Sequence, residues 1–570
     1  MSNLLILIAY YFLILISILG YGLFFLEIFK KKISSTNLGY VGLFGIFVLL
    51  FYSYLSNFIL AHSEIHNILL IILGLILSFL KLFKNFSSYK KEFILTILVF
   101  CLISSSLFLY KNHDDFPYYH FPYTYYLTQQ SFYIGVGQFN HGFRTPSSIF
   151  YLNSLFYLPH AKYYLFHLGS IYILGFANII LLKKIDNFFS YLNLKKKKIN
   201  VTNYLSLFSI IFINIFFYRI AEHGTDRSAQ ILIFLLIIEL MIFINIKRIK
   251  SEDLFNLYLL AALIISLKAF YILYAVFFIP LLLFVKSKNQ TYIQAISFLF
   301  INKFFSIFLL MLFFTLFTYF INTGCIIYPL NFTCFDNFNW GIAKEQVIRM
   351  NNHYELWSKA GLTPTSKVSN PSEYIQGFNW VKNWIDLYFF NKVSDFILGL
   401  IVTVFIVVIF FKKHLFKVKN KKINKFFYLI YIIIMILGVE WFYNHPALRY
   451  GGYCIIALLI FIPICLKLDI SNVNYKYYIK SVIILLILTA LVFNIRNINR
   501  IVKEINFYKY KPLQETFYNL DNNIFRIQKQ MEGHISRYNK CLNSREDCSP
   551  EGQKVYMKYG KIIFNNRVND

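Results

Sequence analysis

Long apolar runs recur along almost the whole 570-residue chain, and they constrain the fold more than any other feature. A run of about 17–25 apolar residues can cross a bilayer as a helix, because a helix satisfies its own backbone hydrogen bonds. The composition, 58% hydrophobic and 15% charged, is too apolar for a soluble protein. We predict an all-α, polytopic integral membrane protein with about fourteen transmembrane helices. The predicted spans are 4–28, 39–60, 67–83, 93–110, 162–182, 203–218, 230–246, 253–267, 269–285, 304–322, 394–411, 426–442, 450–466 and 480–497.

Two of these spans need interpretation. The first is long and no small-residue cleavage site follows it, so we interpret it as a retained helix rather than a signal peptide. The apolar runs on either side of Lys268 are compatible with one long helix or with a hairpin that has Lys268 at its tip.

Basic residues are concentrated in alternate loops. The formal net charge is +29, but the basic residues alternate with spans, so they indicate topology rather than nucleic-acid binding. By the positive-inside rule, the basic loops are cytoplasmic. The remaining loops are then outside, and so are both termini; Arg496, Arg500 and Lys503 after the last span count against that end of the topology. The predicted outer segments are 61–66, 111–161, 219–229, the Lys268 corner, 323–393, 443–449 and the tail from about 498.

Four of the seven cysteines lie in two close pairs within predicted outer segments. Disulfides persist in oxidising compartments outside the cytoplasm, so this placement agrees with the topology. We predict the disulfides Cys325–Cys334 and Cys541–Cys548, with coincidence as the alternative explanation.

Two adjacent carboxylates, Asp114 and Asp115, open the first long outer loop and are followed by His120. Paired carboxylates beside a lipid surface suit general-base catalysis or metal binding, although they could simply solvate the start of a loop. Both long outer loops, 111–161 and 323–393, are rich in aromatic residues and lack a full span. This pattern is typical of amphipathic helices that lie along the membrane surface.

Each of the shorter outer loops also holds polar residues at a span end. An anionic lipid substrate, such as a polyprenyl-phosphate-linked sugar, needs cations for its phosphate, a carboxylate for the reacting hydroxyl and spans for its tail. Each polar residue also has a structural interpretation as a loop hydrogen-bonding group, a helix cap or an interface anchor. The candidate substrate-binding residues are His120, His141, Arg144, Asp226, Arg227, Lys268, His445 and Arg449.

A series of short motifs runs through residues 90–460. They are Asp115 four residues before Tyr119-His120, Gly135-Val136-Gly137, Ser147-Ser148-Ile149-Phe150, the Asp226 loop, the Lys268 corner, Gly324 to Tyr328-Pro329 and Pro446 to Arg449. In this order they resemble GT-C-fold polytopic membrane glycosyltransferases, specifically a largely uncharacterised bacterial branch that uses polyprenyl-phosphate-linked sugars. In the wider class the acidic motif usually follows the first span. Three extra spans precede it here, so residues 1–90 form an N-terminal addition by this comparison.

The resemblance implies roles for several residues. Asp115 would be the general base that deprotonates an acceptor hydroxyl, and Asp114 would orient the acceptor or hold a divalent metal ion. Arg144, Lys268 and Arg449 would neutralise the lipid phosphate. The implied partners are a polyprenyl-phosphate-linked sugar donor, a glycan or lipid acceptor and membrane lipids, with no nucleic acid. The implied location is the bacterial inner (cytoplasmic) membrane, with the active site facing the periplasm or exterior and serving the cell envelope.

Three functional alternatives stay open. A transporter or flippase for lipid-linked saccharides would explain spans and cations, but it predicts charges within spans and internal repeats. The second alternative is an O-antigen polymerase or ligase, and the third is a non-enzymatic scaffold. We expect three regions: N-terminal helices 1–90, a catalytic transmembrane module 91–466 with outer loops 111–161 and 323–393, and a last helix with an extracytoplasmic tail, 467–570.

Overall fold

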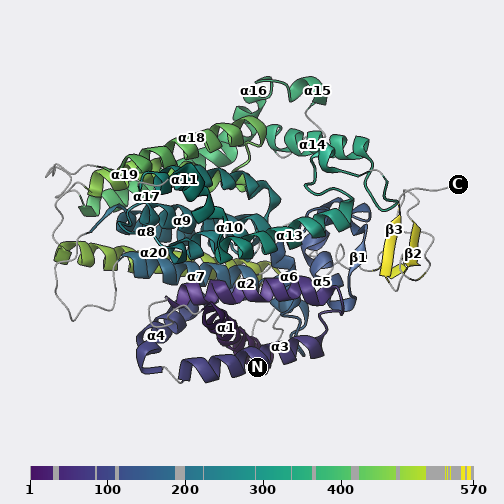
Figure 1. Cartoon of the computed structure of the whole chain (residues 1–570), viewed down its shortest axis with the longest axis horizontal. Helices are drawn as coiled ribbons and strands as arrows, with labels where there is room; N and C mark the ends of the chain where they lie inside the picture. The colour runs from purple at the N-terminus through teal and green to yellow at the C-terminus, as the bar shows by residue number, and fades with distance from the viewer. Residues whose placement is uncertain are drawn as a thin grey trace.

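The computed structural model consists almost entirely of helices (Figure 1). It describes residues 2–29, 37–83, 86–109, 115–185, 199–221, 224–288, 291–335, 337–361, 368–411, 423–469, 475–508, 533, 536, 539–540, 543, 554–558 and 561–565. The helices of the first half are α1 (Ser2–Ile28), α2 (Leu38–Asn57), α3 (Glu64–Ser78), α4 (Phe86–Leu102), α5 (Phe121–Gln129), α6 (Ser148–Ser154), α7 (Leu168–Ile185), α8 (Val201–Phe216), α9 (Gly224–Phe243) and α10 (Phe255–Leu267). Those of the second half are α11 (Phe278–Lys286), α12 (Tyr292–Phe300), α13 (Lys303–Thr323), α14 (Lys344–Lys359), α15 (Pro371–Tyr374), α16 (Val381–Trp384), α17 (Ser394–Phe411), α18 (Lys425–Asn444), α19 (Gly452–Asp469) and α20 (Tyr475–Tyr508).

Ten of the described helical segments are long and apolar enough to cross a membrane, and each coincides with a predicted span. The chain is therefore an all-α, polytopic membrane protein, as predicted. The predicted count of fourteen is not confirmed, because the other four spans fall on α4, α8, α9 and α10. Helices α4, α8 and α10 have 17, 16 and 13 residues. Helix α9 has 20 residues but carries the charged side chains Asp226, Arg227 and Glu239.

The chain reverses direction at Lys268, which resolves the ambiguity of the sequence in favour of a hairpin. Helix α10 ends at Leu267, Lys268 is extended with φ −159° and ψ 125°, and a 3-10 helix follows over Ala269–Phe277. The Tyr258 and Phe278 rings stack at 5.7 Å between centroids, so the two arms lie side by side.

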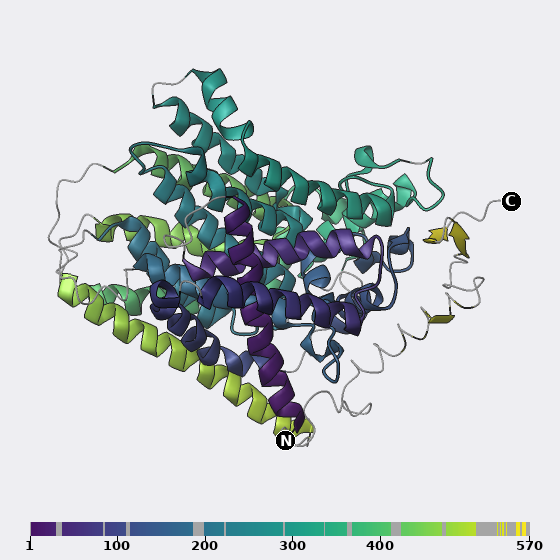
Figure 2. The same ribbon diagram turned by 60° about the horizontal axis from the view of Figure 1, so that its bottom comes forward.

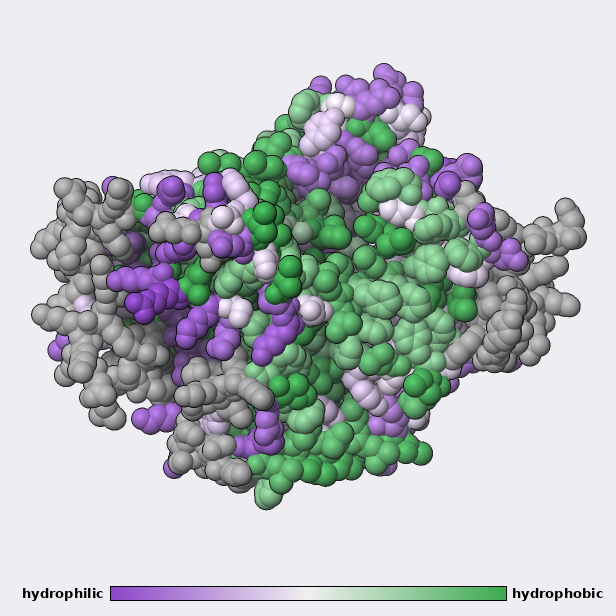
Figure 3. All heavy atoms as spheres, in the orientation of Figure 1, coloured by the Kyte–Doolittle hydropathy of each residue, from purple (hydrophilic) through white to green (hydrophobic). Residues whose placement is uncertain are grey.

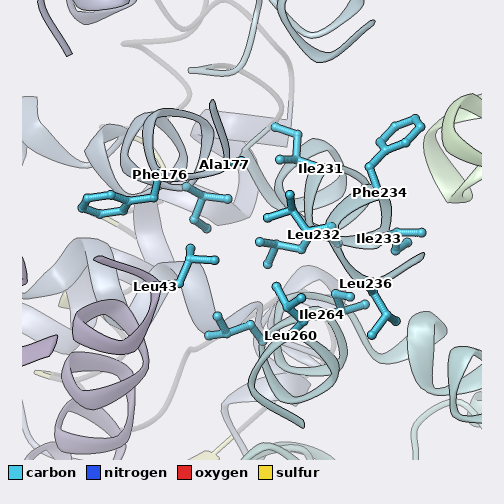
Figure 4. Packing of buried hydrophobic residues seen from close by; sticks show 14 of the residues in the cluster. Leu43, Phe176, Ala177, Ile231, Leu232, Ile233, Phe234, Leu236, Leu260 and Ile264 are labelled. Atoms are coloured by element: carbon cyan, nitrogen blue, oxygen red, sulfur yellow. The ribbon is translucent and has the colours of Figure 1, made fainter. Parts of the chain in front are cut away.

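Helix α9 lies at the centre of the bundle and is buried along nearly its whole length. Its apolar side chains pack between α2, α7 and α10, as Figure 4 shows for Leu43, Phe176 and Leu260. A helix that is apolar on every side belongs in the interior of a bundle. The N-terminal helices are part of the same core, because Leu43 of α2 is fully buried within it.

Polar groups gather at both ends of α9. At its C-terminal end Lys184 pairs with Glu239, which also accepts a hydrogen bond from Tyr40. At its N-terminal end Asp226 pairs with Lys268. Asp226 and Glu239 are separated by thirteen positions, which corresponds to about 20 Å of helix. The space-filling view has the matching pattern, with a hydrophobic band between more hydrophilic regions (Figure 3).

The first long loop and the tail meet in a small sheet at the right of Figure 1. The strands β1 (Tyr133–Ile134), β2 (Lys554–Lys558) and β3 (Lys561–Asn565) have the order β1-β3-β2. Strand β3 runs parallel to β1 and antiparallel to β2. The loop and the tail therefore lie at the same end of the bundle, the end that the topology prediction assigns to the outside. Helix α20 follows one edge of the bundle (Figure 2).

The described part of the first long loop, residues 115–161, does not form surface helices. All seven residues of α6 are buried, and most of α5 is buried as well. The prediction of interfacial helices is wrong for this loop, because its aromatic residues fill the core against α2 instead of facing lipid headgroups. In the second loop the longest described helix, α14, is amphipathic and partly exposed, and its buried residues are Val347, Ser358 and Lys359.

Candidate active site

Two charged side chains from neighbouring helices meet at the N-terminal end of α9. Asp226 lies in the first turn of α9 and is buried, and Lys268 occupies the extended residue after α10. The Lys268 ammonium donates a hydrogen bond to Asp226 Oδ1. Lys268 lies between two apolar segments, where its charge needs a partner, and Asp226 is that partner.

Arg449 joins this pair to the acidic stretch of the first long loop. It lies in the 3-10 turn Leu448–Tyr450, between α18 and α19. Its Nε is 3.3 Å from Asp226 Oδ2, and its Nη2 is 3.2 Å from Asp115 Oδ2. Asp115, Asp226, Lys268 and Arg449 therefore form one ion cluster, built from four separate segments of the chain.

Aromatic rings line one side of the ion cluster. The Tyr450 ring lies 4.7 Å from Lys268 Nζ and 5.4 Å from Arg449 Cζ, within the range of cation–π attraction. Phe270 and His445 pack against the same ring. The cluster is open on another side, because the side chains of Asp115 and Arg449 keep 26% and 30% of their surface exposed. A ligand could therefore reach these two side chains.

The turn that carries Arg449 is fixed by side chains from three directions. Gln230, one turn after Asp226 on α9, donates from Nε2 to Arg449 O at 3.0 Å and accepts from Cys454 N at 3.1 Å. Trp384 Nε1 donates to Pro446 O at 3.0 Å, and Leu448 N donates to the Tyr388 hydroxyl at 3.0 Å. Gln230, Trp384 and Tyr388 were not predicted as site residues from the sequence. Gln230 alone carried a signal, since it is a polar residue at the start of an apolar run.

Local electrostatics favour the charged forms of the cluster. Burial raises the pKa of the Asp226 carboxyl, but Lys268 and Arg449 outweigh burial and hold its pKa below the ordinary value. Burial and then the Asp115 carboxylate raise the pKa of Tyr119 well above its ordinary value. Burial, Lys359 and Lys268 lower the pKa of His445 to about 4, so this imidazole is neutral at pH 7. The site thus combines two carboxylates, two cations and a neutral histidine.

Residues 4–456 match the family described as "Domain of unknown function (DUF8201)". The chain belongs to this family. No curated protein and no solved structure matches it. The matched region contains the N-terminal helices as well as all four residues of the ion cluster.

The other predicted site residues lie in different surroundings. Arg144 is buried and donates from Nε to Gly137 O at 3.1 Å and from Nη1 to the Tyr328 hydroxyl at 2.8 Å. It ties the first long loop to the second. Its expected role in neutralising a phosphate stays a prediction. Arg227 follows Asp226 but packs against Phe217 of the α8–α9 connection, 5.7 Å from its ring.

The two histidines of the first loop lie beside aromatic residues. His120 packs against the rings of Tyr119 and Phe150. His141 Nδ1 is 2.9 Å from the Tyr118 hydroxyl, and burial, Arg144 and His353 lower the pKa of His141 to about 4. Of the predicted substrate-binding histidines, His445 is therefore the one packed on the aromatic lining of the ion cluster.

Two further predictions concern covalent and metal chemistry. Cys325 and Cys334 form the predicted disulfide. Cys541, Cys548 and Asp114 lie outside the described residues. Within the described part of the chain, no three His, Cys, Asp or Glu side chains gather as metal ligands would. The proposed metal role of Asp114 stays a prediction.

Proposed function

We propose that the protein is a GT-C-like membrane glycosyltransferase that moves a sugar from a polyprenyl-phosphate-linked donor to an acceptor hydroxyl. The reaction would take place at the extracytoplasmic face of the bacterial inner membrane and modify a cell-envelope glycan or lipid. The observation that carries this proposal is the ion cluster, since Asp115, Asp226, Lys268 and Arg449 come together from four distant segments. Isolated interface anchors would have no reason to converge in this way.

In the proposed reaction, the acceptor oxygen forms a bond to the anomeric carbon, and the bond between that carbon and the phosphate oxygen breaks. The proton of the acceptor hydroxyl passes to the Asp115 carboxylate, and the bonding electrons leave with the lipid phosphate. Lys268 and Arg449 meet the charge of the departing phosphate, which matters more than acid catalysis because phosphate is a good leaving group once its charge is balanced.

The ion pairs explain how the base could become available. Arg449 contacts both Asp115 and Asp226, and Asp115 is the more exposed of the two carboxylates. A donor phosphate would take the place of Asp115 on the Arg449 guanidinium, because Arg binds phosphate with the same paired N–H groups that bind carboxylate. Asp115 would then be released toward the acceptor, while Asp226 keeps both cations in position.

The surface of α18 offers a place for the lipid tail. An open, largely apolar hollow of about 450 Å³ on this helix is lined by Ile432, Met435, Ile436, Val439, Glu440 and Tyr443. Tyr443 lies two residues before His445, which packs on the aromatic lining of the ion cluster. This arrangement supports a donor whose phosphate lies at the cluster and whose isoprenoid chain follows α18.

The experiment is to purify the full chain in detergent and to measure consumption of polyprenyl-phosphate-linked sugars with a membrane extract as acceptor source. Asp115→Asn should reduce turnover by about 10²–10⁴-fold, the usual contribution of a positioned general base. Asp395→Asn is the matched control, because Asp395 is an exposed carboxylate at the start of α17. An Asp115→Asn protein as active as this control would refute the proposal. Movement of the lipid without cleavage of its sugar bond would favour a flippase.

A further inference from the structure

The second long loop begins with a short hairpin directly after α13. Cys325 and Cys334 lie opposite each other as an antiparallel bridge and form the disulfide described above. Next to this bridge, Phe335 N donates a hydrogen bond to Gly324 O at 3.0 Å. We call residues 324–335 the disulfide hairpin.

Large apolar side chains of the disulfide hairpin lie on its surface. Phe332 keeps 80% of its surface exposed, and Ile326, Leu330 and Phe335 keep 40%, 39% and 46%. Side chains alternate between the two faces of an antiparallel pair, so the two buried cysteines leave their neighbours on the opposite face. Four large apolar side chains exposed on one short hairpin mark a contact with a membrane or with another protein.

One face of α13 leads to the disulfide hairpin. Phe313, Phe317 and Phe320 recur at helical spacing on this face, and Phe313 is exposed. The rings of Phe313 and Phe317 stack at 5.6 Å, and the Phe320 ring lies 5.9 Å from that of Phe335 in the hairpin. Because α13 is long and apolar enough to cross a membrane, its exposed apolar face contacts acyl chains. The aromatic strip therefore continues from the lipid-facing side of a span onto the hairpin.

The distribution of charge in the sequence agrees with this continuity. No charged residue occurs between Lys303 and Asp336. Helix α13, with 21 residues, is by itself long enough to cross the hydrocarbon core. The uncharged sequence nevertheless continues through the whole disulfide hairpin. Trp340 follows and stacks on Phe338 at 4.4 Å, and tryptophan is typical of the headgroup level of a bilayer.

We propose that the disulfide hairpin inserts into the membrane leaflet at this end of α13, with Phe332 and its apolar neighbours among the acyl chains. Apolar side chains of interfacial elements enter a leaflet to a depth of about 5–10 Å. Lipid is the favoured occupant because the aromatic strip already faces lipid along α13 and because the hairpin carries no charge.

The disulfide hairpin also connects the membrane surface to the first long loop. Its buried residue Tyr328 accepts a hydrogen bond from Arg144 Nη1 at 2.8 Å, and Arg144 Nε donates to Gly137 O at 3.1 Å. The same loop carries Asp115 of the ion cluster. Insertion of the hairpin therefore holds the first long loop at a fixed depth relative to the bilayer. This consequence does not require that the protein transfer sugars.

The test replaces Phe332 in the full chain with the photoreactive residue p-benzoylphenylalanine. The protein is irradiated in native membranes and in vesicles of phosphatidylethanolamine and phosphatidylglycerol, and mass spectrometry after proteolysis identifies the adducts. The same residue at Phe313 is the lipid-facing control, and at Glu373, an exposed position of α15, it is the control for a loop in water.

We expect lipid adducts at Phe332 in both preparations, within about twofold of the yield at Phe313 and about tenfold above the yield at Glu373. A yield at Phe332 no higher than that at Glu373 would overturn the proposal. So would adducts with another protein in place of lipid in native membranes, because the exposed side chains would then form a protein interface.

A second measurement places the photoreactive residue at Ile326 and changes Phe332. Since Phe332 lies on the surface, Phe332→Asp and Phe332→Leu remove no contact of the core. Phe332→Asp should lower the yield of lipid adducts at Ile326 by about tenfold, because a carboxylate is costly among acyl chains. Phe332→Leu should change it by less than about twofold. Equal yields for the two variants would show that insertion of Phe332 does not hold the hairpin in the leaflet, contrary to the proposal.

Discussion

Replacement of Asp226 by asparagine tests whether the ion cluster stabilises the fold as the geometry indicates. Asp226→Asn keeps the shape of the side chain but removes the carboxylate that two cations share. At 3.3 Å from Arg449, the attraction is about 5 kcal/mol for an effective dielectric constant of 20, before the cost of desolvation. Removing one member of a fully buried ion pair costs about 3–5 kcal/mol.

The exposed fractions of the three side chains decide where the loss of unfolding free energy lies within this range. The side chains of Asp226, Lys268 and Arg449 are 10%, 24% and 30% exposed, so solvent screens the two cations in part. We therefore expect Asp226→Asn to lower the free energy of unfolding by about 3 kcal/mol. Asp115→Asn should lower it by about 1 kcal/mol or less, because both partners of that pair are about a quarter exposed and Arg449 keeps Asp226.

The free energies can be measured by titrating the purified protein from mild detergent into SDS and following unfolding by circular dichroism. Asp395→Asn serves as the surface control and should change stability by less than about 0.5 kcal/mol. Adding Lys268→Met to Asp226→Asn should recover part of the loss, because it removes one of the two uncompensated cations. If Asp226→Asn is no more destabilising than Asp115→Asn, or if Lys268→Met gives no recovery, the assignment of Asp226 as the shared anion is wrong.

Four further outcomes are expected. Gln230→Leu should release the Arg449 turn and weaken donor binding more than Gln230→Glu, which keeps an acceptor for Cys454 N; equal Michaelis constants for the two variants would contradict this. Burial, Arg144 and His353 lower the pKa of His141 to about 4 in the folded protein, whereas an unfolded histidine has a pKa near 6.5. The contribution of neutral His141 to the free energy of unfolding should therefore be complete above about pH 6.5 and should fall as the pH drops toward 4. Thermal unfolding of His141→Gln should show a smaller drop over this range. The free energy of unfolding of the Cys325→Ser/Cys334→Ser protein should be about 2.5 kcal/mol lower, which is the chain-entropy value for a separation of nine residues. Labelling of the wild type with maleimide before and after reduction should confirm the disulfide. An introduced cysteine at Glu373, an exposed position in the second long loop, should react with an impermeant thiol reagent in intact spheroplasts and one at Lys247 only after lysis; the reverse pattern would invert the topology.

The parts of the fold that could be predicted are those with a local signal. Length and apolar composition locate the ten long helices, because the bilayer sets both properties independently of tertiary packing. Length and apolar composition are not enough for α10, because this helix has only 13 residues and ends before the break at Lys268. They are also not enough for α6, where an aromatic sequence that suits a membrane surface is buried in the core. Aromatic content alone does not distinguish these two environments.

The site also contains residues that could be predicted from the sequence and residues that could not. Asp226, Lys268 and Arg449 could be predicted, because a charge at the end of an apolar segment is costly and marks a partner or a ligand. Arg144 lies inside the first long loop rather than at a span end, and its guanidinium contacts Gly137 O and the Tyr328 hydroxyl. Sequence indicates that a buried charge needs a partner, but only the packing of the two long loops decides which partner it meets.

The two groups of cations around the start of α9 differ in how their charge is met. Lys268 and Arg449 share the Asp226 carboxylate, whereas Arg227, the next residue, points to Phe217 and keeps a buried donor without a partner among the described residues. Adjacent residues of a helix face directions about 100° apart, so a single turn can supply an anion to one site and a cation to another. The first turn of α9 therefore holds the ion cluster together through Asp226 and contacts the α8–α9 connection through Arg227.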